Sequence, residues 1–130
     1  MPVRVKEVMN REVVTVDAGA SLLEALAVMA EKSVKSLVVT PKSDSDAFGI
    51  LTFTDIARKV IANDERLEML NVFDIMTKPC ITISAELDIR FAAKMLTELK
   101  ISRLIVTNGS RLEGIVSLTD LVKSLMKKQT

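Results

Sequence analysis

The feature that most restricts how this chain can fold is an internal repeat that covers almost its whole length. Residues 5–9 (Val-Lys-Glu-Val-Met) return 67 positions later as residues 72–76 (Val-Phe-Asp-Ile-Met), and residues 37–40 return at the same offset as residues 104–107. Two extra loop residues in the first copy then reduce the offset to 65, which aligns residues 49–55 with residues 114–120. A register this long predicts two copies of one structural unit.

Each copy predicts the same order of elements: strand, helix, two strands, helix. Short β-branched runs predict the first strands at residues 13–16 and 80–83, and the later strands are expected at 36–40, 48–53, 103–107 and 112–117. Ser21 with Glu24 has the capping-box pattern of a helix start, and Asp88 is the expected N-cap in the second copy. Asn108-Gly109 predicts a tight hairpin turn.

Apolar residues at helical spacing predict the buried face of three helices. They are Leu22, Ala25, Leu26 and Met29 in the first, Ile89, Ala92, Ala93 and Leu96 in the second, and Leu118, Leu121, Val122 and Leu125 in the third. One βαββα unit of this size cannot bury both faces of its sheet. We therefore expect an α/β (α+β) fold in which two tandem βαββα repeats pack together with pseudo-twofold symmetry. The predicted boundaries are residues 1–62 for repeat 1, 63–71 for a linker and 72–130 for repeat 2.

Composition excludes several function classes. The chain has no histidine, and Cys80 is its only cysteine, which argues against zinc sites and against Ser-His-Asp or Cys-His catalysis. Its four glycines form no phosphate-binding loop. A net charge of +1 and four aromatic residues argue against nucleic-acid binding. We expect a non-catalytic cytoplasmic protein that does not bind membranes, with no metal site and no obligatory cofactor.

The paired motifs resemble the CBS domain pair, the regulatory module named after cystathionine β-synthase, in its stand-alone (Bateman-type) form. The carriers are Glu7-Val8-Met9 with Asp74-Ile75-Met76, and Gly-Ile-Leu-Thr-Phe-Thr-Asp (49–55) with Gly-Ile-Val-Ser-Leu-Thr-Asp (114–120). The resemblance implies that an adenosyl ligand, AMP, ADP, ATP or S-adenosylmethionine, binds in the cleft between the repeats and changes their packing. It also implies a homodimer and an unidentified regulated protein as partners.

The resemblance assigns ligand-binding residues to two sites, with Asp120 and Asp55 binding ribose hydroxyls. Site 1 is expected to combine Lys6, Val8, Met9, Val34, Lys35, Arg103, Ile115, Ser117, Thr119 and Asp120. Site 2 is expected to combine Asp74, Ile75, Met76, Ile101, Ser102, Ser36, Ile50, Thr52, Thr54 and Asp55. Arg58 and Lys123, one helical turn after each aspartate, are possible phosphate contacts. The counterpart of Arg103 in site 2 is Ser36, so site 1 is expected to hold a phosphate better.

Two alternatives remain open at this point. The Thr52/Asp55 and Ser117/Asp120 pairs also fit ordinary helix N-termini, in which a hydroxyl caps the helix and an acid follows in the first turn. The second alternative is a structural dimerisation module whose cleft stays empty. An enzyme using Mg²⁺ held by the aspartates is the weakest candidate.

Overall fold

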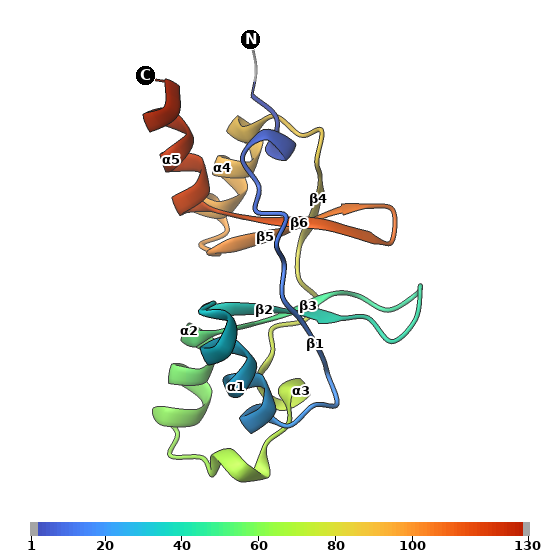
Figure 1. The fold of residues 1–130 in the computed structure, drawn as a ribbon, viewed down its shortest axis with the longest axis vertical. Helices are drawn as coiled ribbons and strands as arrows, with labels where there is room; N and C mark the ends of the chain where they lie inside the picture. Colours follow the sequence, from blue (N-terminus) through green and yellow to red (C-terminus); the bar gives the residue numbers. More distant parts are fainter. Residues whose placement is uncertain (1–2, 129–130) are drawn as a thin grey trace. The chain divides into compact units, whose positions relative to one another are not determined.

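The computed structural model describes residues 3–128 and divides the chain into two compact units (Figure 1). Unit 2 is the continuous stretch from Val14 to Cys80, whereas unit 1 combines residues up to Val13 with those from Ile81 onward. The repeats therefore exchange their first segments: the start of copy 1 folds with the body of copy 2, and residues 72–80 fold with the body of copy 1. We name residues 3–13 lead segment 1 and residues 70–80 lead segment 2.

Unit 2 contains a three-stranded sheet with helices on it. The parallel pair β1 (Thr15–Asp17) and β2 (Ser36–Thr40) is joined through α1 (Leu22–Lys32), and β3 (Gly49–Thr52) is antiparallel to β2. The chain continues through α2 (Phe53–Ile56), the π-helical turn η2 (Ala57–Ile61), the 3-10 turn η3 (Leu67–Met69) and α3 (Val72–Ile75).

Unit 1 repeats this arrangement. Its sheet has the order β4 (Thr82–Ser84), β5 (Arg103–Asn108) and β6 (Arg111–Ser117), with a parallel β4–β5 pair and an antiparallel β5–β6 pair. The 3-10 turn η1 (Val5–Glu7) belongs to lead segment 1, α4 (Ile89–Glu98) joins β4 to β5, and α5 (Leu118–Lys128) follows β6. The predicted βαββα order is confirmed in both copies.

Local sequence signals set the helix starts as predicted. The Ser21 hydroxyl accepts a hydrogen bond from the Glu24 backbone N–H (3.1 Å), and the Asp88 carboxylate accepts one from the Arg90 N–H (2.9 Å). Each unit has its own aliphatic core. Its central members include Leu22, Ala25, Met29, Leu37 and Leu51 in unit 2, and Val5, Ala92, Leu96, Leu104 and Val116 in unit 1.

Several details differ from the sequence predictions. The first strands start at Thr15 and Thr82, two residues later than predicted, because the chain crosses between units at residues 13–14 and 80–81 and gains a strand partner only afterwards. The hairpin turn is centred on Gly109-Ser110, not on Asn108-Gly109, since Asn108 pairs with Arg111. Gly109 has φ +65°, which suits the first central position of a type II′ turn.

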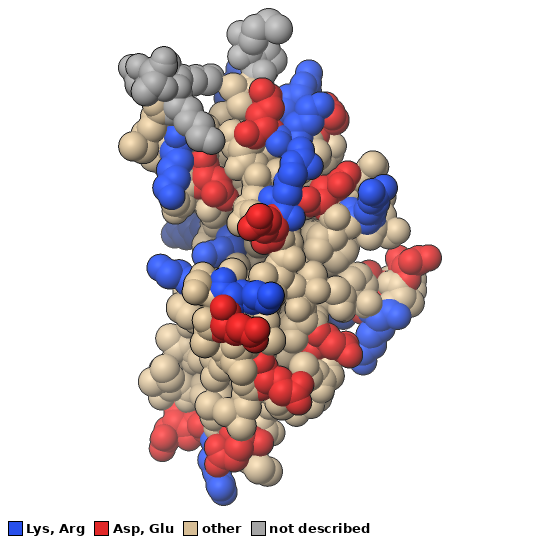
Figure 2. Space-filling view, in the orientation of Figure 1, with Lys and Arg blue, Asp and Glu red and all other residues tan. Residues whose placement is uncertain are grey.

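The predicted apolar stripe of α5 is only partly buried. Leu121 is 7% exposed and packs into the core of unit 1, whereas Leu118, Val122 and Leu125 are 39–59% exposed. Lysine and arginine alternate with aspartate and glutamate over the face of the chain seen in Figure 2. Within residues 3–128, no helix has the length and apolar character needed to cross a membrane. The same residues contain no cluster of three or more carboxylate or thiol ligands that could hold a metal ion.

Candidate functional site

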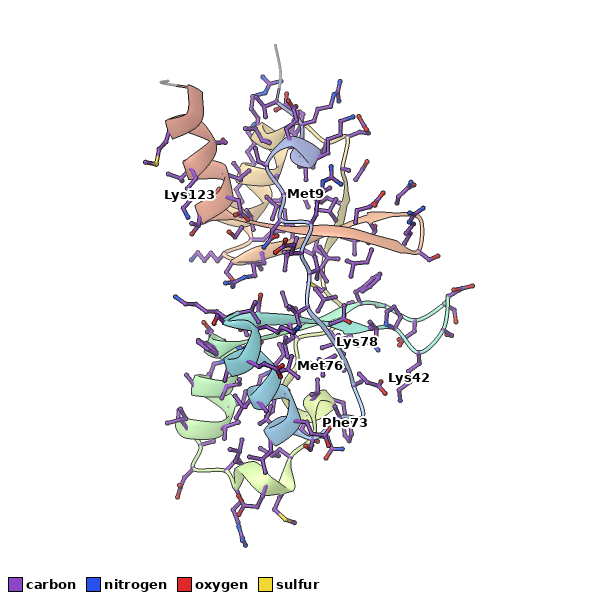
Figure 3. The ribbon with its side chains drawn as sticks, in the orientation of Figure 1. Met9, Lys42, Phe73, Met76, Lys78 and Lys123 are labelled. Atoms are coloured by element: carbon purple, nitrogen blue, oxygen red, sulfur yellow. The ribbon has the colours of Figure 1, made fainter. Side chains whose placement is uncertain are left out.

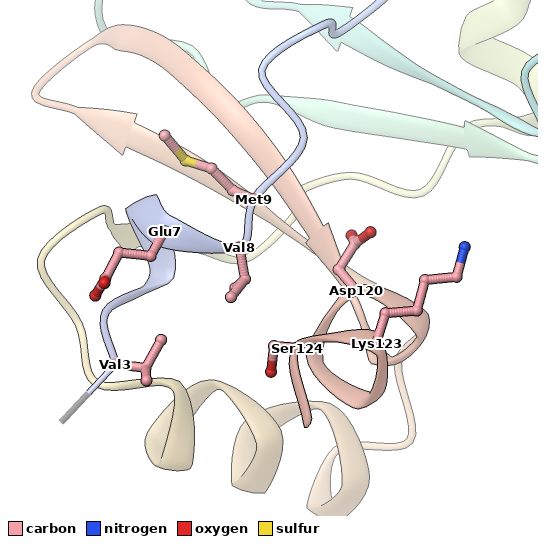
Figure 4. Close-up of a pocket in the computed structure, with 7 residues that line it drawn as sticks. All are labelled: Val3, Glu7, Val8, Met9, Asp120, Lys123 and Ser124. Atoms are coloured by element: carbon pink, nitrogen blue, oxygen red, sulfur yellow. The ribbon is translucent and has the colours of Figure 1, made fainter. Parts of the chain in front are cut away.

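A pocket of about 370 Å³ lies in unit 1, between lead segment 1 and the first turns of α5 (Figure 4). Its volume is within the range of small-molecule sites. The pocket is lined by Val3, Glu7, Val8, Met9, Asp120, Lys123 and Ser124. It therefore combines residues from the start of copy 1 with residues from the end of copy 2.

Backbone hydrogen bonds hold lead segment 1 beside the pocket. The N–H groups of Val5 and Lys6 donate to the carbonyls of Leu87 (2.8 Å) and Ala85 (2.9 Å). Further along, Asn10 and Ile115 exchange N–H to carbonyl bonds of 2.8 and 3.0 Å, as in a short antiparallel pair. This pairing explains why the motif of residues 114–120 begins with glycine: a Cβ on Gly114 would lie 2.8 Å from the Asn10 carbonyl oxygen.

Asp120 caps the start of α5 through one of its two carboxylate oxygens, Oδ2. Its Oδ2 accepts hydrogen bonds from the Ser117 N–H (2.9 Å) and from the Ser117 hydroxyl (3.0 Å), and the Asp120 N–H donates to Ser117 Oγ (3.3 Å). The capping alternative is therefore correct as geometry. Among the side chains of residues 3–126, none donates to Oδ1, so this oxygen can accept a hydrogen bond from a ligand hydroxyl.

The other lining residues give the pocket apolar surface, one cation and a second carboxylate, that of Glu7, which accepts a hydrogen bond from the Arg4 N–H (2.7 Å). Val8 and Met9 supply apolar surface from lead segment 1, and Lys123 brings an ammonium group one helical turn after Asp120 (Figure 4). The Ser124 hydroxyl donates to the Leu121 carbonyl of its own helix (2.5 Å), so this short side chain is folded back onto α5. Such a pocket can hold a flat apolar group, a diol and an anionic group.

The residues predicted for site 1 are only partly brought together. Val8, Met9, Asp120 and Lys123 line the pocket, and Ser117 caps the helix beside it. Ile115 lies in β6, Thr119 is exposed in α5, and Val34 and Lys35 belong to unit 2.

Two cations predicted for site 1 contact other groups. Lys6 donates to Glu86 (2.9 Å), and this hydrogen bond lowers the pKa of the Glu86 carboxyl. The Arg103 guanidinium contacts the Ser102 hydroxyl (3.3 Å).

The residues predicted for site 2 are likewise divided. Unit 2 contains Ser36, Ile50, Thr52, Thr54, Asp55, Arg58, Asp74, Ile75 and Met76, while Ile101 and Ser102 lie in unit 1. Met9 and Met76 occupy equivalent positions of the two lead segments (Figure 3). Both methionines contact the core of their own unit, as expected for gap-filling residues.

Asp55 differs from Asp120 because both of its carboxylate oxygens are engaged. Oδ2 accepts from the Thr52 N–H (3.0 Å) and the Thr52 hydroxyl (2.9 Å). Oδ1 accepts from the Thr77 hydroxyl (3.0 Å) and from the Arg58 guanidinium (3.5 Å). The residue is 4% exposed. Unlike Asp120, Asp55 therefore satisfies its hydrogen-bonding capacity within its own unit.

Sequence reasoning missed several residues at these positions. Ser124 lines the pocket from one helical turn beyond Asp120, and this i, i+4 spacing could have indicated it. Val3 lies before the recognised motif and carried no signal of its own. Thr77 and Lys59 have partners 22 and 16 positions away in the chain, Asp55 and Ile75, and no local pattern indicates such contacts.

Comparison with known protein families matches both copies of the repeat to the same family model. The family model described as CBS domain matches residues 5–62 and again residues 72–127. An uncharacterised protein of Methanopyrus kandleri, MK0525, is 30% identical over 122 residues, which are 93% of this chain and 62% of that protein. The next two curated relatives are covered over 44% and 31% of their lengths, so the chain spans less than two thirds of the curated relatives it matches.

Solved structures with the same fold include a hexameric protein and a CBS domain pair with bound ligands. The hexameric CBS-CP12 protein from bloom-forming cyanobacteria superposes with a TM-score of 0.90 at 34% identity, covering 94% of this chain and 67% of that one. The CBS domain pair of protein MJ0100, solved in complex with 5′-methylthioadenosine and S-adenosyl-L-methionine, has a TM-score of 0.83 at 22% identity. That match covers 98% of this chain and 99% of the other, and at this identity it shows the fold alone.

Proposed function

Because the chain belongs to the CBS domain family, we propose that it is a regulatory module that binds an adenosyl ligand in the Asp120 pocket. The observation that carries the proposal is the uncommitted Oδ1 of Asp120 at the edge of a pocket of about 370 Å³. No catalytic step is proposed, and binding itself is the activity. The output is a change in conformation or in packing that a second copy or a regulated protein senses.

The lining residues fit the three parts of an adenosyl compound. The two hydroxyls of a ribose can donate to the Asp120 carboxylate through Oδ1, which has two acceptor positions left, whereas Oδ2 already accepts two hydrogen bonds from Ser117. Val8 and Met9 offer an apolar wall for the adenine ring. Lys123 can neutralise a phosphate or a carboxylate carried on the ribose. AMP, ADP, ATP and S-adenosylmethionine share this chemistry and are the proposed ligands.

Isothermal titration of the full chain with AMP, ATP and S-adenosylmethionine tests the proposal. We expect at least one of them to bind, and Asp120→Asn to weaken binding roughly tenfold or more, because a charged acceptor of two hydroxyls is replaced by a neutral amide. Asp44→Asn, a matched change at an exposed loop carboxylate, should leave the affinity unchanged. Equal affinities for Asp120→Asn and the unmodified chain would refute the proposed site.

A second candidate function, self-association with an empty pocket, is favoured by the outer face of α5. Leu118, Val122, Leu125 and Met126 are 39–67% exposed there, and such a row of apolar side chains is typical of a protein–protein contact. The hexameric assembly of the cyanobacterial CBS-CP12 protein, which has the same fold, supports this candidate. Sedimentation analysis of Val122→Lys distinguishes the two functions: loss of assembly with ligand binding retained supports the ligand-binding module, whereas assembly without any ligand binding supports the structural one.

A further inference from the structure

The internal repeat allows the Asp120 pocket of unit 1 to be compared with its counterpart in unit 2, position by position. Equivalent residues of the two lead segments are 67 positions apart in the sequence. Equivalent residues in the motifs 49–55 and 114–120, and in the helices that follow them, are 65 positions apart. The counterparts of Val8, Met9 and Asn10 are thus Ile75, Met76 and Thr77, and those of Asp120, Lys123 and Ser124 are Asp55, Arg58 and Lys59. The apolar positions are alike, whereas the polar positions next to the aspartate change from Asn to Thr, from Lys to Arg and from Ser to Lys.

The first difference concerns the aspartate itself. Thr77 lies in lead segment 2, which pairs with β3 through the Thr77 N–H to Ile50 carbonyl bond (2.8 Å) and its reciprocal (3.0 Å). This pairing places the Thr77 hydroxyl 3.0 Å from Asp55 Oδ1. Asn10 pairs in the same way with Ile115 in unit 1, but its Oδ1 accepts from the Glu12 N–H (3.0 Å). The Thr77 hydroxyl therefore donates to Asp55 Oδ1, the carboxylate oxygen to which a ribose hydroxyl would otherwise donate.

The second difference concerns the space beside the aspartate. The Lys59 ammonium donates to the carbonyl oxygen of Ile75 over 2.8 Å, so this long side chain bridges η2 to lead segment 2. At the equivalent place in unit 1, Ser124 is short and bonded within its own helix, and the space next to Val8 belongs to the pocket. Lys59 thus contacts Ile75, the residue of unit 2 that is equivalent to Val8 in the wall of the unit 1 pocket.

The backbone that carries Lys59 also differs between the units. Lys59 and Arg58 lie in η2, a π-helical turn closed by the Ala62 N–H to Ala57 carbonyl bond (2.9 Å), whereas the same part of unit 1 is regular α-helix. A π-helical turn contains an extra residue, which changes the direction of the side chains on it. In this turn the Arg58 guanidinium faces Asp55 (3.5 Å) and Lys59 reaches the lead segment.

We propose that Lys59 and Thr77 occupy the place around Asp55 that corresponds to the Asp120 pocket, which we call the Asp55 half-site. Arg58, whose side chain is 65% exposed, adds a positive charge beside the Asp55 carboxylate, so that each chain binds one ligand, at Asp120. This inference rests on the proposed function for the identity of the ligand, but the internal occupation of the Asp55 half-site can be measured without any ligand. Lys59 and Thr77 are then the residues that set the stoichiometry of the module.

Titration calorimetry of the full chain with AMP and with S-adenosylmethionine measures the stoichiometry. We expect one ligand per chain, and Ser124→Lys, which copies the lysine of unit 2 into the Asp120 pocket, should weaken binding roughly tenfold or more. The double variant Lys59→Ser with Thr77→Asn copies the residues of unit 1 and should add a second binding event. Lys32→Ser, a matched loss of an exposed lysine, should leave one event. Two ligands bound by the unmodified chain would overturn the proposal.

Lysine labelling provides the readout that does not depend on a ligand. In a short pulse of acetic anhydride followed by peptide mass spectrometry, Lys59 should react roughly tenfold more slowly than Lys123, since a charge-assisted hydrogen bond must open first. Equal rates for the two lysines would refute the internal occupation. A protected Lys59 in a chain that binds no adenosyl ligand would support the occupied half-site and reject the proposed function.

Discussion

Replacing Gly114 by alanine would place a methyl group against the backbone of lead segment 1. The added Cβ would lie 2.8 Å from the Asn10 carbonyl oxygen and 2.9 Å from the Met9 sulfur. Met9 can turn its side chain, but the Asn10 carbonyl is held by its bond from the Ile115 N–H (3.0 Å). The segment must therefore move, and it forms one side of the Asp120 pocket.

The magnitude follows from three contributions. Overpacking a filled site costs about 1–3 kcal/mol, and alanine returns about 0.4–1 kcal/mol by restricting the unfolded chain. If the two backbone bonds between Asn10 and Ile115 are lost, each adds about 0.5–1.5 kcal/mol. Together these contributions span about 1–6 kcal/mol, and we expect Gly114→Ala to lower the free energy of unfolding by about 3 kcal/mol.

Two other glycines provide matched controls. A Cβ on Gly49 would meet its nearest neighbours, the Met76 sulfur and the Thr77 carbonyl, at 3.2 Å, so Gly49→Ala should cost about half as much. A Cβ on Gly19 would meet nothing within 4 Å, so Gly19→Ala should be neutral or stabilising by up to about 1 kcal/mol.

Urea unfolding followed by far-ultraviolet circular dichroism measures all three variants, since the chain has neither tryptophan nor tyrosine for fluorescence. If Gly114→Ala is no less stable than Gly49→Ala, the reasoning from the close approach of lead segment 1 is wrong.

Three further predictions concern other parts of the chain. Asp55→Ala should cost about 1–3 kcal/mol because it leaves buried donors without an acceptor, and Asp120→Ala should cost less; urea titration giving the reverse order would contradict the hydrogen-bond assignment. Ser21→Ala removes the N-cap of α1 and should cost about 1 kcal/mol in the same assay, with no change disproving the cap. The hydrogen bond from Lys78 lowers the pKa of Asp46 to about 2, so this contact stabilises the folded chain above pH 4 and its contribution is lost as the pH falls toward 2. An NMR titration should give a higher pKa for Asp46 in Lys78→Ala, and an unchanged value would show that the ion pair does not form in solution.

Features that depend on neighbouring residues could be predicted from the sequence. The repeat register, the βαββα order and the N-caps Ser21 and Asp88 all follow from local patterns, because caps and hydrophobic periodicity act within one or two turns of chain. The resemblance to the CBS domain pair, carried by the repeated motifs, identified Asp120, Met9 and Val8, which line one pocket. The errors occurred where a local pattern met a non-local constraint, as at the first strands, which begin only after the chain has crossed to its new sheet.

The sequence by itself determined that two similar units form and which aspartate each contains. Only the tertiary structure decided that the units exchange their lead segments and that their aspartates differ. The Thr77 hydroxyl donates to Asp55 and the Lys59 ammonium donates to the carbonyl of Ile75. Asp120, in contrast, lies beside a pocket, and no side chain in the described part of the chain donates to its Oδ1. These contacts join residues 16 or 22 positions apart, and their geometry depends on how lead segment 2 pairs with β3 and on a π-helical turn, neither of which a local sequence pattern specifies.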